Sequence, residues 1–196
     1  MFKVNKKIKK NKGMTYVELI VVLSIFGIMS SIVLFNYNKF QAKVDIKNLA
    51  NDIALKIVQA QKDAMSGKWN TNAPSGWKPS YGVYFDLSVP NHFIYFADFS
   101  NDHIFNDGSC YGECLDNINI TKGKISKIEE CSTEGCLSLV STPNPLSITF
   151  TRPNSGASFS PNLSASSNYI RTTISSSDDS FNGYIKIYPS GRIQVN

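Results

Sequence analysis

A run of 20 residues without a charged side chain, Leu19 to Asn38, constrains this chain more than any other feature of its sequence. An α-helix rises about 1.5 Å per residue, so a helix of this length spans the roughly 30 Å hydrocarbon core of a bilayer. The run therefore predicts one membrane-spanning helix. Six lysines and no acidic residue precede it in residues 1–13. By the positive-inside rule, this leaves the N-terminus in the cytoplasm and the C-terminal part of the chain outside.

The remaining composition is that of a folded domain. Of the 196 residues, 42% are hydrophobic and 12% aromatic, which excludes a disordered or fibrous chain and fits one globular unit with appendages. Removing the six lysines of residues 1–13 from the formal net charge of +5 leaves −1 for residues 14–196. We therefore expect the basic character to belong to the N-terminal segment and not to a nucleic-acid-binding face.

The helix is expected to continue beyond the apolar run. Apolar residues recur at helical spacing and define one face of an amphipathic helix: Ile46, Leu49, Ile53, Ile57, Ala60 and Ala64. We therefore divide this part into a membrane helix over 14–38 and an amphipathic continuation over 39–66. The helix should end at about Met65, because Ser66-Gly67 is a typical C-terminal signal.

Residues 67–196 change to a β pattern after the turn-rich segment 69–79. Short β-rich runs separated by turn residues predict a meander or two small sheets: 81–87, 92–99, 124–130, 137–141, 146–152, 168–176, 183–189 and 192–195. The last two should form a hairpin with its turn at Pro189-Ser190-Gly191. The Ser-rich segments 155–167 and 175–180 are expected to be polar loops. The predicted fold class is α+β, a long N-terminal helix packed on a C-terminal antiparallel β domain.

The N-terminal segment resembles the prepilin signal of type IV pilins and type II secretion pseudopilins. The resemblance covers Lys3 to Phe35 and rests on a lysine-rich leader that ends at Gly13, on Glu18 as the fifth residue after it, and on the charge-free helix. It implies that a prepilin peptidase cleaves between Gly13 and Met14 and then N-methylates Met14. Members most often carry Phe where this chain has Met14.

Glu18 also needs a physical explanation. A carboxylate within an apolar membrane segment costs about 2.5–3.5 kcal/mol, so it is expected to have a partner. The resemblance implies that this partner is the freed α-amino group of Met14 in an adjacent subunit, and that the pair sets the stagger of subunits in a filament. The alternative is that Glu18 lies at the level of the lipid headgroups.

The C-terminal part is similar to H-type minor pseudopilins and T-type fimbrial minor pilins. The similarity covers about residues 146–196 and rests on Phe150, Gly156 and Ser190-Gly191-Arg192. It implies a structural minor subunit without enzymatic activity or cofactor, first a single-pass protein of the cytoplasmic membrane and then part of an extracytoplasmic filament. Its implied partners are the prepilin peptidase and methyltransferase, other pilin or pseudopilin subunits and the cytoplasmic membrane. A major pilin, or a membrane-anchored binding module such as an adhesin or DNA-uptake pilin, is the alternative.

Four cysteines cluster within an insertion at 100–136: Cys110, Cys114, Cys131 and Cys136. In an exported domain, an even set of clustered cysteines predicts disulfides, most simply Cys110–Cys114 and Cys131–Cys136, although crossed pairings remain open. The spacing lacks the tight knuckles of a zinc ribbon, so we expect no metal. The neighbouring acidic residues do not follow an EF-hand pattern and are expected to form a solvated loop: Asp98, Asp102, Asp107, Glu113 and Asp116.

Catalytic chemistry finds little support in the sequence. The histidines, His92 and His103, lie on an aromatic strand and in a polar loop, and neither has a Ser or Cys at a motif-defined position. No phosphate-binding loop, dinucleotide fingerprint or zinc-protease motif occurs. We therefore expect both histidines to be structural.

Processing is the first testable prediction. The mass of protein extracted from membranes should show loss of residues 1–13 and one added methyl group on Met14. Gly13→Leu should leave the precursor uncleaved, because glycine lets the backbone enter a protease in an extended form without a clashing side chain. A mature N-terminus at Met1, or one near Ser31 as a secretory signal ending at Ser30-Ser31 would give, would contradict the prediction.

Overall fold

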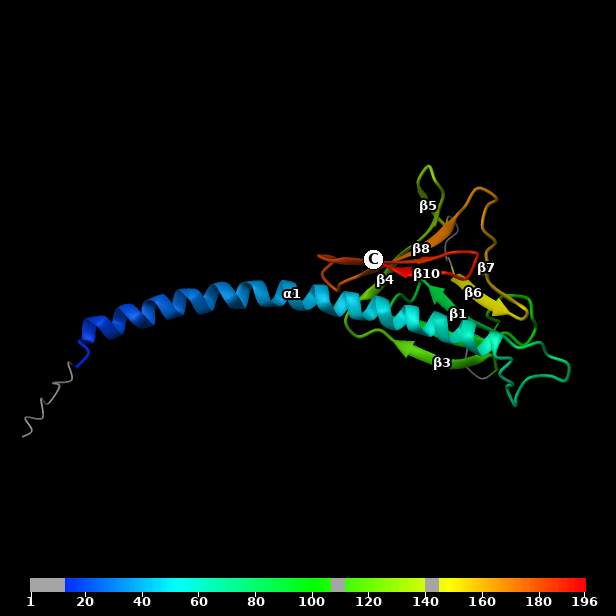
Figure 1. Ribbon diagram of the computed structural model, residues 1–196, viewed down its shortest axis with the longest axis horizontal. Coiled ribbons are helices and arrows are strands. Elements are labelled where there is room, and N and C mark those ends of the chain that lie inside the picture. The colour runs from blue at the N-terminus through cyan, green and yellow to red at the C-terminus, as the bar shows by residue number, and fades with distance from the viewer. Residues whose placement is uncertain (1–12, 107–111, 140–144) are drawn as a thin grey trace, which may run out of the picture. The chain divides into compact units, whose positions relative to one another are not determined.

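The structure is a computed structural model that describes residues 13–106, 112–139 and 145–196. The chain divides after Gln41 into two compact units. In the first, the described residues form the N-terminal part of a single long helix. The second, Ala42–Asn196, contains the rest of this helix and the strands (Figure 1). The amphipathic segment 39–66 is therefore almost wholly a part of the β domain.

Helix α1 runs without interruption from Tyr16 to Met65. It begins after Thr15, whose hydroxyl accepts a hydrogen bond from the backbone N–H of Glu18 at 3.3 Å, as an N-cap residue does. It ends at Met65, and Gly67, two residues later, has a φ of 66°. There the backbone N–H groups of Gly67 and Lys68 donate to the carbonyls of Ala64 and Asp63, a Schellman motif. The predicted end of the helix at Met65 is confirmed.

The strands form two five-stranded antiparallel sheets. Sheet A has the order β3-β2-β1-β6-β7, made of β3 (Cys114–Asn119), β2 (His92–Ala97), β1 (Ser80–Asp86), β6 (Pro145–Thr151) and β7 (Asn154–Ser160). Sheet B has the order β10-β9-β8-β4-β5, made of β10 (Ile193–Val195), β9 (Asn182–Ile187), β8 (Tyr169–Ser175), β4 (Lys124–Cys131) and β5 (Cys136–Ser138).

The α+β class and the two sheets agree with the sequence, and the C-terminal hairpin has Ile193 opposite Ile187 as expected. Two strands were not predicted, and both lie at edges of sheet A. Strand β7 corrects the prediction that 155–167 is a loop, because seven residues of small and polar side chains pair with β6 and bury Phe159. Strand β3 carries mostly exposed side chains, so its sequence lacks the apolar alternation of a buried strand.

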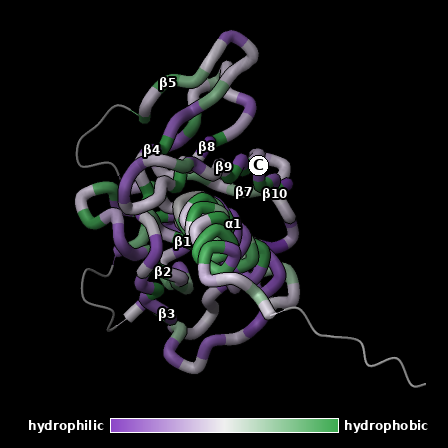
Figure 2. Tube along the Cα trace, turned by 90° about the vertical axis from the view of Figure 1, so that its left-hand side faces the viewer, coloured by the Kyte–Doolittle hydropathy of each residue, from purple (hydrophilic) through white to green (hydrophobic). Residues whose placement is uncertain are grey.

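The second half of α1 supplies the centre of the core. Its buried face consists of Ile46, Ala50, Ile53, Ile57, Ala60 and Ala64, which belong to one cluster with apolar side chains of both sheets. Figure 2 looks along this helix, with β1, β2 and β3 on one side of it and β4, β8, β9 and β10 on the other. Alanines on this face let the strands approach closely: Ala50, for example, lies against Gly183 of β9. The predicted apolar face is confirmed, with Leu49 only partly buried.

Polar contacts fix the helix end against sheet A. The Asp63 carboxylate accepts hydrogen bonds from the Tyr95 hydroxyl at 2.6 Å and from Lys68 Nζ at 2.8 Å. Burial by itself would raise the pKa of Asp63, but these hydrogen bonds outweigh it and hold the pKa below its ordinary value. Burial and the Asp63 charge raise the pKa of Tyr95. Asp63 therefore stays ionised, and Tyr95 protonated, at neutral pH.

Ile53 and Leu55, two isomeric side chains that lie two positions apart on α1, test this packing. Ile53 is 0% exposed and Leu55 is 65% exposed, and truncation to alanine removes the same atoms from each. Ile53→Ala should lower the free energy of unfolding by about 2–5 kcal/mol, because it leaves a cavity between the sheets, whereas Leu55→Ala should change it by less than about 0.5 kcal/mol. Urea denaturation of the β domain measures both. Equal effects would contradict the placement of the helix.

Candidate functional site

The predicted cleavage site lies just before helix α1. Gly13, Met14 and Thr15 are exposed and have no helical structure, and a side chain added at Gly13 would meet no atom within 4 Å. Residues 1–12, with the six lysines of the leader, lie outside the described residues. The Gly13–Met14 peptide bond is thus in non-helical, exposed backbone, the form in which a protease can bind it.

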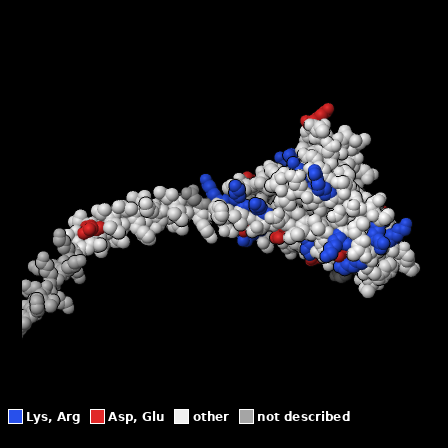
Figure 3. Space-filling model, viewed as in Figure 1, with Lys and Arg blue, Asp and Glu red and all other residues white. Residues whose placement is uncertain are grey.

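Glu18 lies in the first turn of α1, three residues after the N-cap Thr15. A carboxylate is favourable there because it faces the positive end of the helix dipole. Among the described residues, no cationic side chain lies within ion-pair distance of it. In Figure 3 an acidic group stands out on the otherwise uncharged part of this helix. The helix dipole stabilises the charged carboxylate in part, and the carboxylate can still pair with a cation.

The first half of α1 exposes its apolar side chains all round. Leu23, Phe26 and Ile28 are 59%, 69% and 64% exposed, and none of the described residues between Met14 and Gln41 is buried. This is one helix, near the N-terminus, that is long and apolar enough to cross a membrane. Such a continuous apolar surface needs lipid or another apolar helix around it, since soluble proteins rarely leave one in water.

The residues of the C-terminal motif come together where β7 meets the β9–β10 turn. Phe150 is buried and pairs with Ala157, whose N–H donates to the carbonyl of Pro189 at 2.9 Å. A side chain at Gly156 would lie 2.9 Å from that same carbonyl. Gly191 has a φ of 82°, and a Cβ there would lie 2.1 Å from the carbonyl oxygen of Ser155. Both glycines therefore allow backbone to touch backbone.

Helix α1 contacts the same point through Gln61. Its amide nitrogen donates to the carbonyls of Ser155 at 2.8 Å and of Gly191 at 3.2 Å. One side chain of the helix thus ties β7 of sheet A to the turn of sheet B. The motif has a structural explanation, since it joins the helix and the two sheets.

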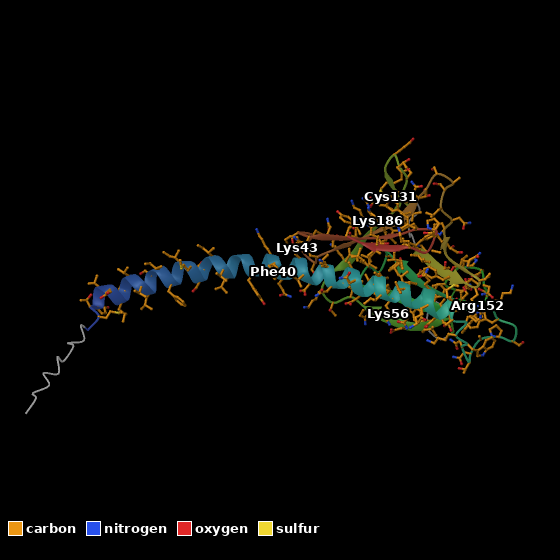
Figure 4. The ribbon with its side chains drawn as sticks, viewed as in Figure 1. Phe40, Lys43, Lys56, Cys131, Arg152 and Lys186 are labelled. Atoms are coloured by element: carbon orange, nitrogen blue, oxygen red, sulfur yellow. A yellow bond between two sulfur atoms is a disulfide. The ribbon has the colours of Figure 1, made fainter. Side chains whose placement is uncertain are left out.

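Two of the cysteines are paired as expected. Cys131 at the end of β4 and Cys136 at the start of β5 form a disulfide with a Cα–Cα distance of 4.0 Å, which closes the hairpin between these strands. Figure 4 labels Cys131 on this strand. Cys114 is also disulfide-bonded. Its expected partner, Cys110, lies outside the described residues, as does Asp107.

Two acidic residues are not in a solvated loop, which corrects the sequence prediction. Asp98 is fully buried, and its carboxylate accepts hydrogen bonds from the backbone N–H groups of Asp102 and His103. Glu113 is buried too and accepts from the N–H groups of Phe99 and Asn106. Burial raises the pKa of Glu113, and these N–H groups partly offset the rise. The two carboxylates organise the segment 98–106 from within.

The two histidines lie in different parts of the β domain, and the ring Nδ1 of His103 is 3.9 Å from the buried Asp98 carboxylate. The ring Nδ1 of His103 lies 2.8 Å from the hydroxyl of Thr149, and its backbone has a φ of 67°. His92 begins β2, which pairs with β3. No group of three or more His, Cys, Asp or Glu side chains with metal-binding geometry occurs within 13–106, 112–139 and 145–196. A groove of about 540 Å³ lies between α1 and β3, lined by residues such as Asp52, Lys56 and Ile118.

Comparison with protein-family models, with curated proteins and with solved structures found no match to this chain. Sequence reasoning missed the burial of Asp98 and Glu113. The signal available was weak: each follows or precedes turn residues at a strand end, where a carboxylate can accept hydrogen bonds from turn N–H groups. It also missed that Gln61, on the predicted helix, reaches the predicted C-terminal turn.

Gly191 and Gly76 give a matched test of the close contact at the C-terminal turn. Both have a φ of 82°, but a Cβ at Gly76 meets nothing within 4 Å. Gly76→Ala should cost about 1 kcal/mol of stability for the backbone conformation alone, and Gly191→Ala more than about 3 kcal/mol, because it also forces β7 and Gln61 away. Thermal denaturation of the two variants measures the difference. Equal costs would show that the turn does not contact β7.

Proposed function

We propose that this chain is a structural subunit of a type IV pilus-like filament or a type II secretion pseudopilus, and that it is a minor component. In this proposal the precursor is inserted in the cytoplasmic membrane, cleaved after Gly13 and methylated on Met14. It then leaves the membrane by assembling through the first half of α1. The chain acts by its assembly and carries out no catalysis.

One observation carries the proposal: a single helix has two halves with opposite surroundings. From Ile46 to Ala64 its apolar face is buried between two sheets, whereas from Met14 to Leu34 its apolar side chains are exposed. A simple anchor would need only the apolar half. A filament subunit requires both halves, an apolar segment that assembles with its neighbours and a segment that belongs to the core of the displayed domain.

Glu18 supports assembly over anchoring. Its carboxylate lies at the start of the apolar half, next to a junction whose cleavage would create a new α-amino group on Met14. In a low-dielectric surrounding, an ammonium–carboxylate contact is worth several times its value in water. Because the two groups are four residues apart at a helix start, pairing between neighbouring subunits would fix how far one helix is displaced along the other.

Glu18→Ala tests the assembly role. The variant should be cleaved and methylated normally but should enter filaments at least about tenfold less, because its neighbour's Met14 ammonium is left without a partner. The fraction of the chain recovered in filaments sheared from the cells, relative to the membrane fraction, measures incorporation, and intact mass measures processing.

Ser24→Ala is the matched control. Ser24 lies on the same exposed half, and its hydroxyl donates to the carbonyl of Ile20 in the same helix, so its removal should leave incorporation unchanged. Normal incorporation of Glu18→Ala would contradict the role of Glu18. Absence of the unchanged chain from every filament fraction would overturn the filament proposal and favour a membrane-anchored binding module, such as an adhesin.

A further inference from the structure

Two exposed lysines, Lys43 and Lys47, lie one turn apart on α1, just beyond the uncharged run that ends at Asn38. Ile46 is the first of the described helix residues to be buried, and Gly123, directly before β4, lies against its side chain. The domain thus begins to cover the helix at Ile46, and Lys43 comes three residues earlier. Figure 4 labels Lys43, and Figure 3 shows blue atoms on the helix beyond its uncharged stretch. We call Lys43 and Lys47 the lysine pair.

The described residues do not compensate the charge of the lysine pair. No carboxylate among them lies within ion-pair distance of Lys43 or Lys47. The carboxylate of Asp45, which lies between the two in sequence, pairs instead with Lys122 at 3.1 Å, and its side chain is 19% exposed. Like charges one helical turn apart repel each other. An anion that both lysines contact would offset this repulsion, so the pair favours a negatively charged ligand.

The loops that flank Ile46 carry charges of both signs. Asp179, between β8 and β9, pairs with Lys124 at 2.8 Å. The carboxylate of Asp178, in the same loop, accepts hydrogen bonds from the hydroxyls of Ser176 and Ser180. Together with the helix, this end of the domain has more cations than carboxylates: Lys43, Lys47, Lys122 and Lys124 against Asp45, Asp178 and Asp179. The excess positive charge therefore lies with the lysine pair.

The distance of the lysine pair from the uncharged run matches the depth of lipid headgroups. At about 1.5 Å of rise per residue, Lys43 lies about 7.5 Å beyond Asn38 along the helix, and Lys47 about 13.5 Å. The headgroup region adds about 5–8 Å on each side of the hydrocarbon core, and helical side chains tilt toward the helix N-terminus. Lysine side chains can thus reach back to the phosphates while their stems cover the helix. Tyr37, 59% exposed, is of a residue type enriched at membrane interfaces, and Lys39 adds a third cation one turn before the pair.

We propose that Lys43 and Lys47 bind the phosphate of an anionic phospholipid, in the outer leaflet of the membrane that the uncharged run spans. The headgroup supplies a phosphate monoanion, and each lysine near an anionic surface raises the affinity about fivefold. A zwitterionic lipid fits less well, because its own cation cancels that charge. A free phosphate also fits less well, since exposed lysines hold an isolated ion weakly in water. The inference rests on the membrane insertion in the proposed function, and not on cleavage or filament assembly.

The experiment measures which lipid stays bound to the full chain, with the six leader lysines replaced by glutamine so that they do not bind lipid themselves. The chain is extracted into a maltoside detergent from vesicles of equal parts phosphatidylglycerol and phosphatidylcholine, and the retained lipid is quantified by mass spectrometry. Phosphatidylglycerol should be enriched at least about fivefold over phosphatidylcholine, the gain expected from one lysine. Lys43→Gln/Lys47→Gln should lower this enrichment at least about threefold, and Lys39 holds the remainder. High salt should lower the enrichment as well, because it screens the lysines.

Lys62→Gln/Lys78→Gln is the matched control, because both lysines are exposed and their replacement removes the same charge at the C-terminal end of α1 and beyond it. It should leave the enrichment unchanged. An excess of glycerol phosphate in the wash separates the two sources of phosphate, and it should not displace the lipid. Displacement, equal effects of the two double variants, or no enrichment of phosphatidylglycerol by the unchanged chain would overturn the proposal. Filament incorporation is scored in cells and lipid retention on the isolated chain, so each proposal can fail alone.

Discussion

Helix α1 packs its Ile and Ala face, from Ile46 to Ala64, against both sheets, and the β domain depends on this contact. Neither sheet buries its inner face without the helix, since side chains of both sheets and of the helix form one apolar cluster. The Schellman turn at Gly67, the hydrogen bonds of Asp63 and those of Gln61 fix the end of the helix in place. The same helix begins as an exposed apolar segment, so one element contributes both to the core of the domain and to a surface that needs an apolar surrounding.

Local patterns in the sequence were enough to predict the helix and most of the strands. The spacing of Ile46, Ile53 and Ile57 and the glycine at position 67 are short-range signals, and the structure confirms them. Strand β7 was not predictable in this way, because its Ser- and Gly-rich residues pair only where β6 offers an edge. Asp98 and Glu113 were assigned to solvent because their burial depends on how segment 98–106 folds over them, which no local pattern encodes.

The candidate sites also differ in whether the sequence alone could reveal them. Gly13, Met14 and Glu18 lie within six residues of one another, so their pattern could be recognised without a structure. The C-terminal motif could be noted from the sequence. Only the fold explains it, because it shows that Gly156 and Gly191 lie against the backbone of neighbouring segments. The clustering of Lys127, Arg171 and Lys186 on sheet B could not be predicted, because these residues become neighbours only through the register of β4, β8 and β9. The net charge of the domain does not reveal this cluster, because it sums over all faces of the domain.

The central claim is that the exposed half of α1 is a protein–protein surface as well as a membrane segment. A photo-crosslinking amino acid placed at Leu23, which is 59% exposed, tests this most directly in cells that assemble the chain. The account predicts crosslinks to a second protein subunit in the sheared filament fraction, and a crosslinked band that disappears when Glu18→Ala is introduced. Crosslinks to lipid alone, in the membrane fraction alone, would contradict it and leave the helix as an anchor.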